Sequence, residues 1–346
     1  MSHEQLRQLQ QARAFDGTPP ESELGGLHVP FDELTGDRRY ELVLSETVRR
    51  GERVALIGAS GAGKSSVTAH VLHPYLDDAV PIRVRVGEED DSVPSHGAAF
   101  ARHLVHTVAT FLDQHDQANG TAAAKLDEKA GGHVSKRSKK LGLTVPTPWL
   151  QNAALTYELG GVVAPANVSG QDIVGVAQQT LQLFMSAGLR PVLVLDDTDH
   201  WLVRPSLPDP APLRAGFFGN VVRLIAEQLS DAGAVIAVHH SYLTDPNYQA
   251  ATEFLHRTIT LPPVPDAAGL DRILARRANR ALGRDDSVSL GDVLAGDATD
   301  QLLSFHRSDP NLRRLVRVAH GALTHACDAG APLITVGHVD QAIADL

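Results

Sequence analysis

Residues 58–65 read Gly-Ala-Ser-Gly-Ala-Gly-Lys-Ser, which matches the pattern G-x-x-x-x-G-K-[ST] at every fixed position. Glycines adopt backbone conformations that other residues avoid, so such a loop can turn several N–H groups toward one anion. Lys64 adds a positive charge, and the hydroxyl of Ser65 suits Mg²⁺. The stretch predicts a loop that holds the phosphates of a nucleoside triphosphate, with ATP and Mg²⁺ as the expected ligands.

The residues on either side of the loop favour this interpretation over a chance glycine-rich turn. Val54–Ile57 is a short apolar run typical of a buried strand, and an apolar-periodic helix is expected over Lys64–Leu72. The N-terminus of that helix favours an anion. The residues expected to contact the nucleotide are Gly58, Ala59, Ser60, Gly61, Ala62, Gly63, Lys64, Ser65 and Ser66, and Ser65 is also expected to bind the metal.

A second apolar run, Val192–Leu195, ends in Asp196 and Asp197. A strand that ends in carboxylates is the expected partner of a phosphate loop, so we assign Asp196 to the Mg²⁺ shell and Asp197 to the attacking water. Most enzymes of this kind carry Glu at the second position. Because Asp is one methylene shorter, a poor reach to the water would make hydrolysis slow and switch-like. Asp199 is a weaker candidate for this role, and a solvated acidic strand end is the structural alternative.

Short β-branched runs alternate with helical patterns, which indicates a three-layer α/β fold with a parallel sheet. The expected strands are Arg53–Ile57, Val80–Val86, Pro191–Leu195, Ala234–Val238 and Thr258–Leu261. The helices expected between them are Lys64–Leu72, Gly97–Leu112, Ile173–Ser186 and Leu213–Leu229. After Pro262, Pro263 and Pro265 the pattern becomes helical, over Ala267–Leu282, Asp300–Phe305, Asn311–Cys327 and Val336–Leu346.

These patterns predict three parts along the chain. They are an N-terminal adaptor segment at 1–48, a phosphate-loop core at 49–265 and a helical lid at 266–346. The core contains a long irregular insertion at about 116–170, and a loop of this length is either functional or disordered. In the adaptor we expect helices at Glu4–Ala14 and Arg38–Arg50, separated by a stretch that Gly17, Pro19, Pro20, Gly25 and Gly26 keep irregular.

Composition limits the class of protein. The chain has 346 residues, 43% of them hydrophobic, and its net charge of -10 argues against a surface that coats nucleic acid as a whole. The single cysteine excludes an internal disulfide and cysteine-based zinc sites. The polar N-terminus and the absence of an apolar run near about 20 residues predict a cytoplasmic protein without a membrane partner. The 17 histidines show no zinc spacing, and His103 and His106 are expected on one packed or solvated helix face.

The phosphate loop, the Asp196–Asp197 strand end and the helical tail together resemble an AAA+ ATPase over about residues 27–346. Within that class the chain looks most like the origin-recognition/Cdc6-like branch, and its Leu-Asp-Asp element is also similar to the signalling STAND ATPases. The resemblance implies ATP hydrolysis, a nucleotide site shared between subunits, and an adenine near His28, Val29 and Phe31.

The resemblance also implies three further site residues. His239, or its neighbour His240, would sense the γ-phosphate from the end of the fourth strand. Arg257 would reach into the site of the neighbouring subunit, a task that suits a permanently charged guanidinium. Arg313, with Arg314 second, would contact the nucleotide from the lid. The structural alternatives are a strand-end histidine that makes local hydrogen bonds, a surface arginine, and a plain basic helix with Asp309 as its N-cap and Pro310 in its first turn.

Three functions follow. The first is an ATPase that forms a homo-oligomer and regulates a separate effector protein. The second is a slow STAND-like nucleotide switch in signalling or defence. The third is a DNA-associated loader or transposition regulator that contacts nucleic acid through the basic run Lys136, Arg137, Lys139 and Lys140, for which a solvated loop is the alternative.

Overall fold

The structure is a computed structural model, and it describes residues 3–72, 79–86, 92–115, 170–186, 188–203, 209–283 and 289–346. The Lys136–Lys140 run and the rest of the predicted insertion up to residue 169 lie outside the described residues.

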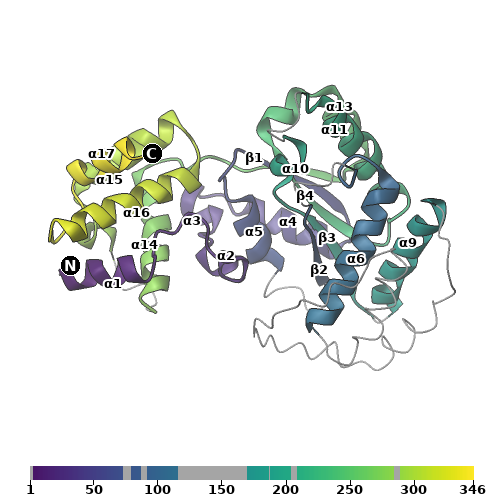
Figure 1. Ribbon diagram of the computed structural model, residues 1–346, viewed down its shortest axis with the longest axis horizontal. Coiled ribbons are helices and arrows are strands. Elements are labelled where there is room, and N and C mark those ends of the chain that lie inside the picture. The colour runs from purple at the N-terminus through teal and green to yellow at the C-terminus, as the bar shows by residue number, and fades with distance from the viewer. Residues whose placement is uncertain are drawn as a thin grey trace. The chain divides into compact units, whose positions relative to one another are not determined.

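The centre of the fold is a five-stranded parallel sheet in the order β2-β3-β4-β1-β5 (Figure 1). The strands are β1 (Arg53–Gly58), β2 (Ala79–Val84), β3 (Arg190–Leu195), β4 (Gly233–His239) and β5 (Arg257–Thr260). Strand β2 pairs with β3 from Ala79↔Arg190 to Val84↔Leu195, and β3 pairs with β4 from Val192↔Gly233 to Leu195↔Ile236. Parallel neighbours need crossover connections, which the intervening helices supply. The predicted α/β fold with a parallel sheet is confirmed.

Buried strands explain why the sequence signal is so clear here. The last five residues of β1 and of β3 are buried, as are the first six of β4. A strand covered on both faces reads as a continuous apolar run, which is the pattern that identified these segments.

The helices follow the periodic segments of the sequence. In the N-terminal part they are α1 (His3–Gln11), α2 (Glu21–Leu27), α3 (Phe31–Thr35) and α4 (Arg39–Arg49). Around the sheet lie α5 (Lys64–Leu72), α6 (Gly97–His115), α9 (Gly170–Ser186), α10 (Thr198–Leu202), α11 (Ala211–Gly216), α12 (Arg223–Glu227) and α13 (Pro246–Ala251). The C-terminal helices are α14 (Ala267–Ala281), α15 (Gly296–Ser308), α16 (Leu312–Asp328) and α17 (Val336–Ala344).

The chain divides into two compact units. Unit 1 comprises Met1–Ser45, Leu56–Tyr75 and Ile259–Leu346, and unit 2 comprises Glu46–Ala55 and Leu76–Thr258. Unit 1 therefore holds the phosphate loop together with the C-terminal helices, whereas unit 2 holds the acidic end of β3.

The N-terminal helix α1 belongs to the core of unit 1. Leu6 and Leu9 are fully buried in a cluster with residues of α14, α15, α16 and α17. Each such leucine contributes about 1.5–3 kcal/mol by leaving water. Arg277 Nη1 adds a hydrogen bond of 2.7 Å to the carbonyl oxygen of Asp16. The other side chains of α1 are polar, so the sequence alone indicated a polar helix and not this packing role.

Two of the glycines expected to interrupt the N-terminal part lie inside helix α2 instead. A β-carbon on Gly25 would lie 3.2 Å from the carbonyl oxygen of Ala69, and one on Gly26 would lie 3.3 Å from the guanidinium carbon of Arg280. These glycines therefore allow close packing of α2 on α5 and α14, and the prediction of a break at this point is wrong.

The helix expected over Leu213–Leu229 is present but has a π-helical segment, Phe217–Val222, at its centre. A β-carbon on Gly216 would lie 2.7 Å from Ser95, and Asn220 Nδ2 donates to the Ser95 carbonyl at 2.9 Å. The local widening thus coincides with tight packing against the loop before α6, which no helical periodicity could reveal.

Candidate functional site

The phosphate loop joins the end of β1 to the start of α5 with two glycines in left-handed conformations. Gly61 has a φ of 76° and Gly63 a φ of 90°, values that favour glycine strongly. Gly58 is needed for a different reason, since a β-carbon there would lie 2.8 Å from that of Ala62. The backbone geometry therefore accounts for all three glycines of the motif.

Lys64 begins helix α5 and is buried, with 8% of its surface exposed. Its Nζ donates to the carbonyl oxygens of Gly58 at 2.8 Å and of Ala59 at 3.0 Å. These bonds hold the ammonium group within the loop, at the N-terminus of the helix. The charge of the lysine and the helix dipole there both favour a bound anion.

The two serines after Lys64 lie in different environments. Ser65 is partly exposed next to the lysine. The hydroxyl of Ser66 instead donates to the Leu24 carbonyl oxygen at 3.1 Å, which fastens α5 to α2. The structure thus gives Ser66 a packing role, and its expected contact with the nucleotide stays a prediction.

The N-terminus of α16 lies against the tip of the loop, within unit 1. A β-carbon on Gly61 would lie 2.5 Å from Asn311 Oδ1 and 2.9 Å from the Arg313 backbone nitrogen. Asn311 is the N-cap of α16, and its Oδ1 accepts from the amides of Arg313 at 3.0 Å and Arg314 at 3.2 Å. Asp309 instead ends helix α15, so its predicted capping of α16 is wrong.

The two candidate lid arginines are held differently. Arg314 Nη1 forms an ion pair with Asp309 Oδ2, and its guanidinium lies 6.0 Å from the ring centre of Phe305. Arg313 is exposed, and within the described part of the chain its side chain makes no ion pair. The backbone of Arg313 is close to Gly61, so the structure brings this predicted residue to the phosphate loop.

The segment expected near the adenine is a buried cluster. His28, Val29 and Phe31 are 5%, 6% and 4% exposed. Glu41 joins it, because its Oε1 lies 2.9 Å from His28 Nε2 and accepts from the Phe31 amide at 2.7 Å. Burial alone would raise the pKa of Glu41, but the hydrogen bonds from His28 and Phe31 outweigh it and lower that pKa.

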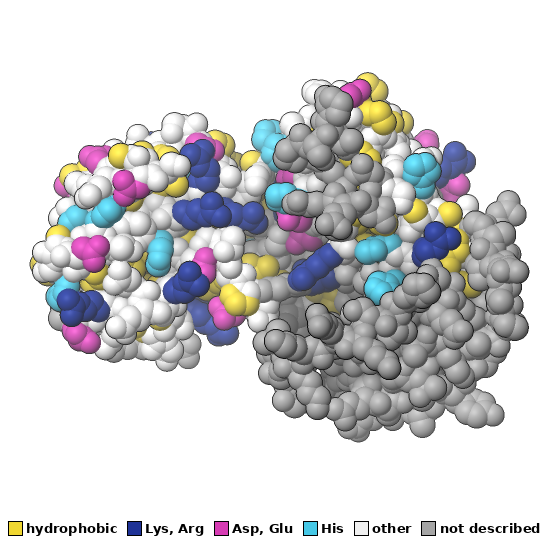
Figure 2. Space-filling view, in the orientation of Figure 1, with side chains coloured by type: hydrophobic (Ala, Val, Ile, Leu, Met, Phe, Trp, Pro, Cys, Tyr) yellow, Lys and Arg dark blue, Asp and Glu magenta, His cyan; other side chains and the backbone are white. Residues whose placement is uncertain are grey.

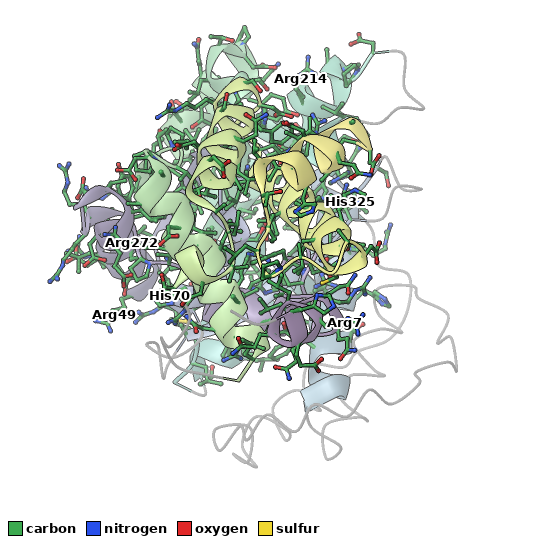
Figure 3. All side chains as sticks on the ribbon, turned by 90° about the vertical axis from the view of Figure 1, so that its left-hand side faces the viewer. Arg7, Arg49, His70, Arg214, Arg272 and His325 are labelled. Carbon is green, nitrogen blue, oxygen red and sulfur yellow. The ribbon has the colours of Figure 1, made fainter. Side chains whose placement is uncertain are left out.

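His70, from the end of α5, packs on the same cluster. Its ring centre lies 4.7 Å from that of His28. Burial lowers the pKa of His70, and the nearby charges of His28 and of Arg276 on α14 lower it further. Figure 3 shows His70 near helix α14, in line with this electrostatic contact.

The acidic end of β3 forms a tight turn in unit 2. Asp197 has a φ of 57° and a ψ of 31°, and its amide donates to Asp196 Oδ1 at 2.9 Å. The Asp197 side chain is 59% exposed, and its Oδ2 lies 3.7 Å from His200 Nε2. The buried hydroxyl of Thr198 donates to the carbonyl oxygen of Ala237 on β4.

Arg83 is a neighbour of Asp196 that the sequence reasoning missed. It pairs with Val194 across β2 and β3, and Asp196 comes two residues after Val194, directly after the end of β3. Burial lowers the pKa of Arg83, while the Asp196 carboxylate acts in the opposite direction. An arginine inside an apolar strand, as in Val80–Val86, was the available signal.

His239 and Arg257 also lie in unit 2. His239 ends β4, and its Nδ1 lies 2.7 Å from the Ser241 hydroxyl and accepts from the Ser241 amide at 3.3 Å. His240 begins the following 3₁₀ turn. Arg257 is the exposed first residue of β5. His239 thus makes local hydrogen bonds, and Arg257 is accessible to a second molecule.

Among the described residues, no group of three or more His, Cys, Asp or Glu side chains could hold a metal ion. Within the same residues, each helix is too short or too polar to cross a lipid bilayer. The metal ligands expected from the sequence, the hydroxyl of Ser65 and the carboxylate of Asp196, stay a prediction.

Comparisons with known proteins concern the family and the fold. Residues 41–209 match the family described as AAA ATPase domain. No curated protein matches the sequence. Among solved structures, Cdc6p from Pyrobaculum aerophilum is similar with a TM-score of 0.52 at 15% identity, over 92% of this chain and 68% of that one. Drosophila ORC bound to DNA is similar with a TM-score of 0.50 at 14% identity, over 95% of this chain and 67% of that one.

At such identities the likeness to the solved structures concerns the fold. The match to the family model concerns the segment that includes both the phosphate loop and the acidic end of β3. The resemblance stated from the sequence is thereby confirmed: residues 41–209 match the AAA ATPase domain family, and the chain shares the fold of the Cdc6 and ORC structures.

Proposed function

We propose that this protein binds ATP with Mg²⁺ at residues 58–65, hydrolyses it, and uses the cycle in a homo-oligomer to regulate a separate effector protein. The observation that carries the proposal is the phosphate loop itself. Its glycines at positions 61 and 63 have positive φ, and the buried ammonium of Lys64 lies at the start of α5. This arrangement fits a polyphosphate through backbone amides, a fixed cation and a helix dipole.

In this proposal Lys64 binds the β- and γ-phosphate oxygens, and Ser65 and Asp196 hold Mg²⁺. The bound Mg²⁺ would neutralise charge on the phosphates. Asp197 orients and deprotonates the attacking water. The short, exposed side chain of Asp197 also supports the second candidate, a slow nucleotide switch, because an exposed carboxylate must be ordered before it can act.

Two arginines have complementary roles in the proposal. Arg313 contacts the nucleotide from its own chain, which the closeness of its backbone to Gly61 supports. Arg257 acts on the nucleotide of a neighbouring subunit, which its exposure at the start of β5 supports. His239 senses the γ-phosphate from the end of β4.

A role on DNA has weaker support. One similar protein is described as bound to DNA. Figure 2, however, shows one face of the molecule, on which the acidic, basic and histidine side chains of the described residues are interspersed. With a net charge of -10, contact with DNA would have to use a local basic segment such as Lys136–Lys140.

Nucleotide binding is tested with Lys64→Ala and a fluorescent ATP analogue, with Arg50→Ala as a control that removes an exposed cation 3.9 Å from Glu46. Binding should be lost in the first variant and kept in the second. Wild-type affinity in Lys64→Ala would refute the proposal.

Sharing of the site between subunits is tested by mixing two inactive variants. Asp197→Asn keeps Arg257, whereas Arg257→Ala keeps Asp197. Each variant alone should lack ATPase activity, and the mixture should regain part of it because some interfaces then combine both intact residues. A mixture that stays inactive, although the variants co-assemble in mass photometry, would contradict the shared site.

A further inference from the structure

The turn that carries Asp197 is fixed at both ends by the same neighbouring strand. Before the turn, Leu195 of β3 pairs with Ile236 of β4. After it, the hydroxyl of Thr198 donates to the carbonyl oxygen of Ala237, the next residue of β4. Only Asp196 and Asp197 lie between these anchors, so the chain must turn within two residues.

Asp197 makes this turn in the left-handed region, with a φ of 57° and a ψ of 31°. Residues other than glycine adopt this conformation rarely, and aspartate is among those that tolerate it. Such a conformation persists where the surrounding structure imposes it. The two anchors, together with the hydrogen bond from the Asp197 amide to Asp196 Oδ1, hold the turn in this conformation.

The anchor after the turn is rigid. Thr198 is 2% exposed and begins helix α10, whose Trp201 and Leu202 are also buried. The ring of Trp201 packs edge-on against Phe217, with ring centres 6.0 Å apart. The burial of these side chains holds α10, and with it the end of the turn, in the core.

We infer that Thr198 is a positioning residue for hydrolysis, whose bond to Ala237 holds the turn that presents the Asp197 carboxylate. The inference rests on the proposed function, in which Asp197 acts on the attacking water. Ala237 and His239 lie two residues apart on one face of β4. The same bond thus fixes the Asp197 turn relative to the strand that carries the predicted γ-phosphate sensor.

A purely structural role for Thr198 makes a different prediction. A buried hydroxyl that only satisfies a carbonyl oxygen would affect stability and leave turnover per folded molecule unchanged. Thr180 offers a matched control, since it is also 2% exposed and its hydroxyl donates to the Val176 carbonyl at 2.7 Å within helix α9. Replacing either residue by Val removes the same kind of bond at nearly constant volume.

The experiment compares Thr198→Val, Thr198→Ser and Thr180→Val in the full chain, with kcat, KM, Kd for a fluorescent ATP analogue, and Tm measured for each. In Thr198→Val we expect kcat to fall at least about tenfold, since small misplacements of a catalytic group cost about that much or more. Its Kd should stay near the wild-type value. Thr198→Ser keeps the hydroxyl and should restore most of kcat, and Thr180→Val should keep the wild-type kcat whatever its Tm.

Asp197→Asn separates failure of this inference from failure of the proposed function. If that variant hydrolyses ATP at the wild-type rate, the assignment of Asp197 is wrong. If it is inactive while Thr198→Val has the wild-type kcat, the positioning role is wrong. A Thr198→Ser variant as slow as Thr198→Val would also overturn the role, because the hydroxyl would then not matter. Should Thr198→Val fail to fold, Thr198→Ala provides the same comparison with less crowding.

Discussion

The side chain of Asn311 fills the space that a β-carbon on Gly61 would occupy. The distance from that β-carbon position to Asn311 Oδ1 would be 2.5 Å. The tip of the phosphate loop and the N-cap of α16 are therefore in direct contact within unit 1. Glycine at position 61 therefore meets two requirements. It leaves room for Asn311, and it adopts the positive φ of the loop.

This contact predicts that Gly61→Ala is more harmful than Gly63→Ala. Both positions have positive φ, which costs alanine about 1–2 kcal/mol. Only Gly61 also has neighbours, since nothing lies within 4 Å of a β-carbon on Gly63. Thermal unfolding without nucleotide should show the lower Tm for Gly61→Ala. Adding Asn311→Gly, which keeps partial capping, should recover part of the loss, and equal Tm values for the two alanine variants would contradict the clash.

The neighbouring arginines Arg313 and Arg314 are expected to separate binding from stability. Arg314→Ala removes the ion pair with Asp309 and the contact with Phe305, so Tm should fall slightly, by the equivalent of about 1 kcal/mol or less for an exposed pair. Arg313→Ala should leave Tm unchanged and weaken ATP binding about tenfold, as expected for loss of one charge-assisted contact. Isothermal titration beside thermal unfolding tests this. If Arg314→Ala alone weakened ATP binding, Arg314 and not Arg313 would be the residue that contacts the nucleotide.

The left-handed turn at Asp197 predicts how substitutions at this position rank in stability. This ranking can be measured without an activity assay. Glycine and asparagine tolerate this region better than alanine. Asp197→Gly and Asp197→Asn should therefore be at least as stable as the wild type, and Asp197→Ala should be less stable by about 1 kcal/mol. Urea unfolding measures the order. An alanine variant as stable as the glycine variant would show that the turn relaxes.

The half-buried Glu41 predicts loss of stability in acid. Hydrogen bonds from His28 and Phe31 hold its pKa below the ordinary value of 4.5 despite burial. A carboxylate with a lowered pKa contributes stability above its unfolded pKa, and the contribution is lost as pH falls below about 4.5 toward the folded pKa. Glu41→Gln should lower the free energy of unfolding by about 1–3 kcal/mol at pH 7. The free energy of unfolding of this variant should also change less with pH below 4.5 than that of the wild type. Unfolding between pH 3 and pH 7 provides the measurement, with Glu46→Gln, an exposed position on the same helix, as control.

Much of the fold could be predicted because its signals are local. A buried parallel strand needs an apolar run, so β1, β3 and β4 were recognisable from short segments such as Val192–Leu195. The phosphate loop needs its glycines and its lysine at fixed spacing, so residues 58–65 were recognisable for the same reason. Helix α5 was expected over Lys64–Leu72, and it has those bounds.

Other features could not be predicted because they depend on contacts between segments far apart in the sequence. Gly25 lies in a helix whose backbone Ala69 approaches closely, and Arg83 lies near Asp196 because β2 and β3 pair in register. The N-cap of α16 is Asn311 rather than Asp309, because Asp309 ends α15 instead.

The sequence by itself determined the α/β class, the positions of the strands and the loop for the phosphates, since backbone conformation and burial at these points follow from residue type. Only the tertiary structure decided which side chains surround that loop and how Asp197 is presented. The Asn311–Gly61 contact and the Thr198–Ala237 bond each join residues that come together only after the sheet and the helices have packed.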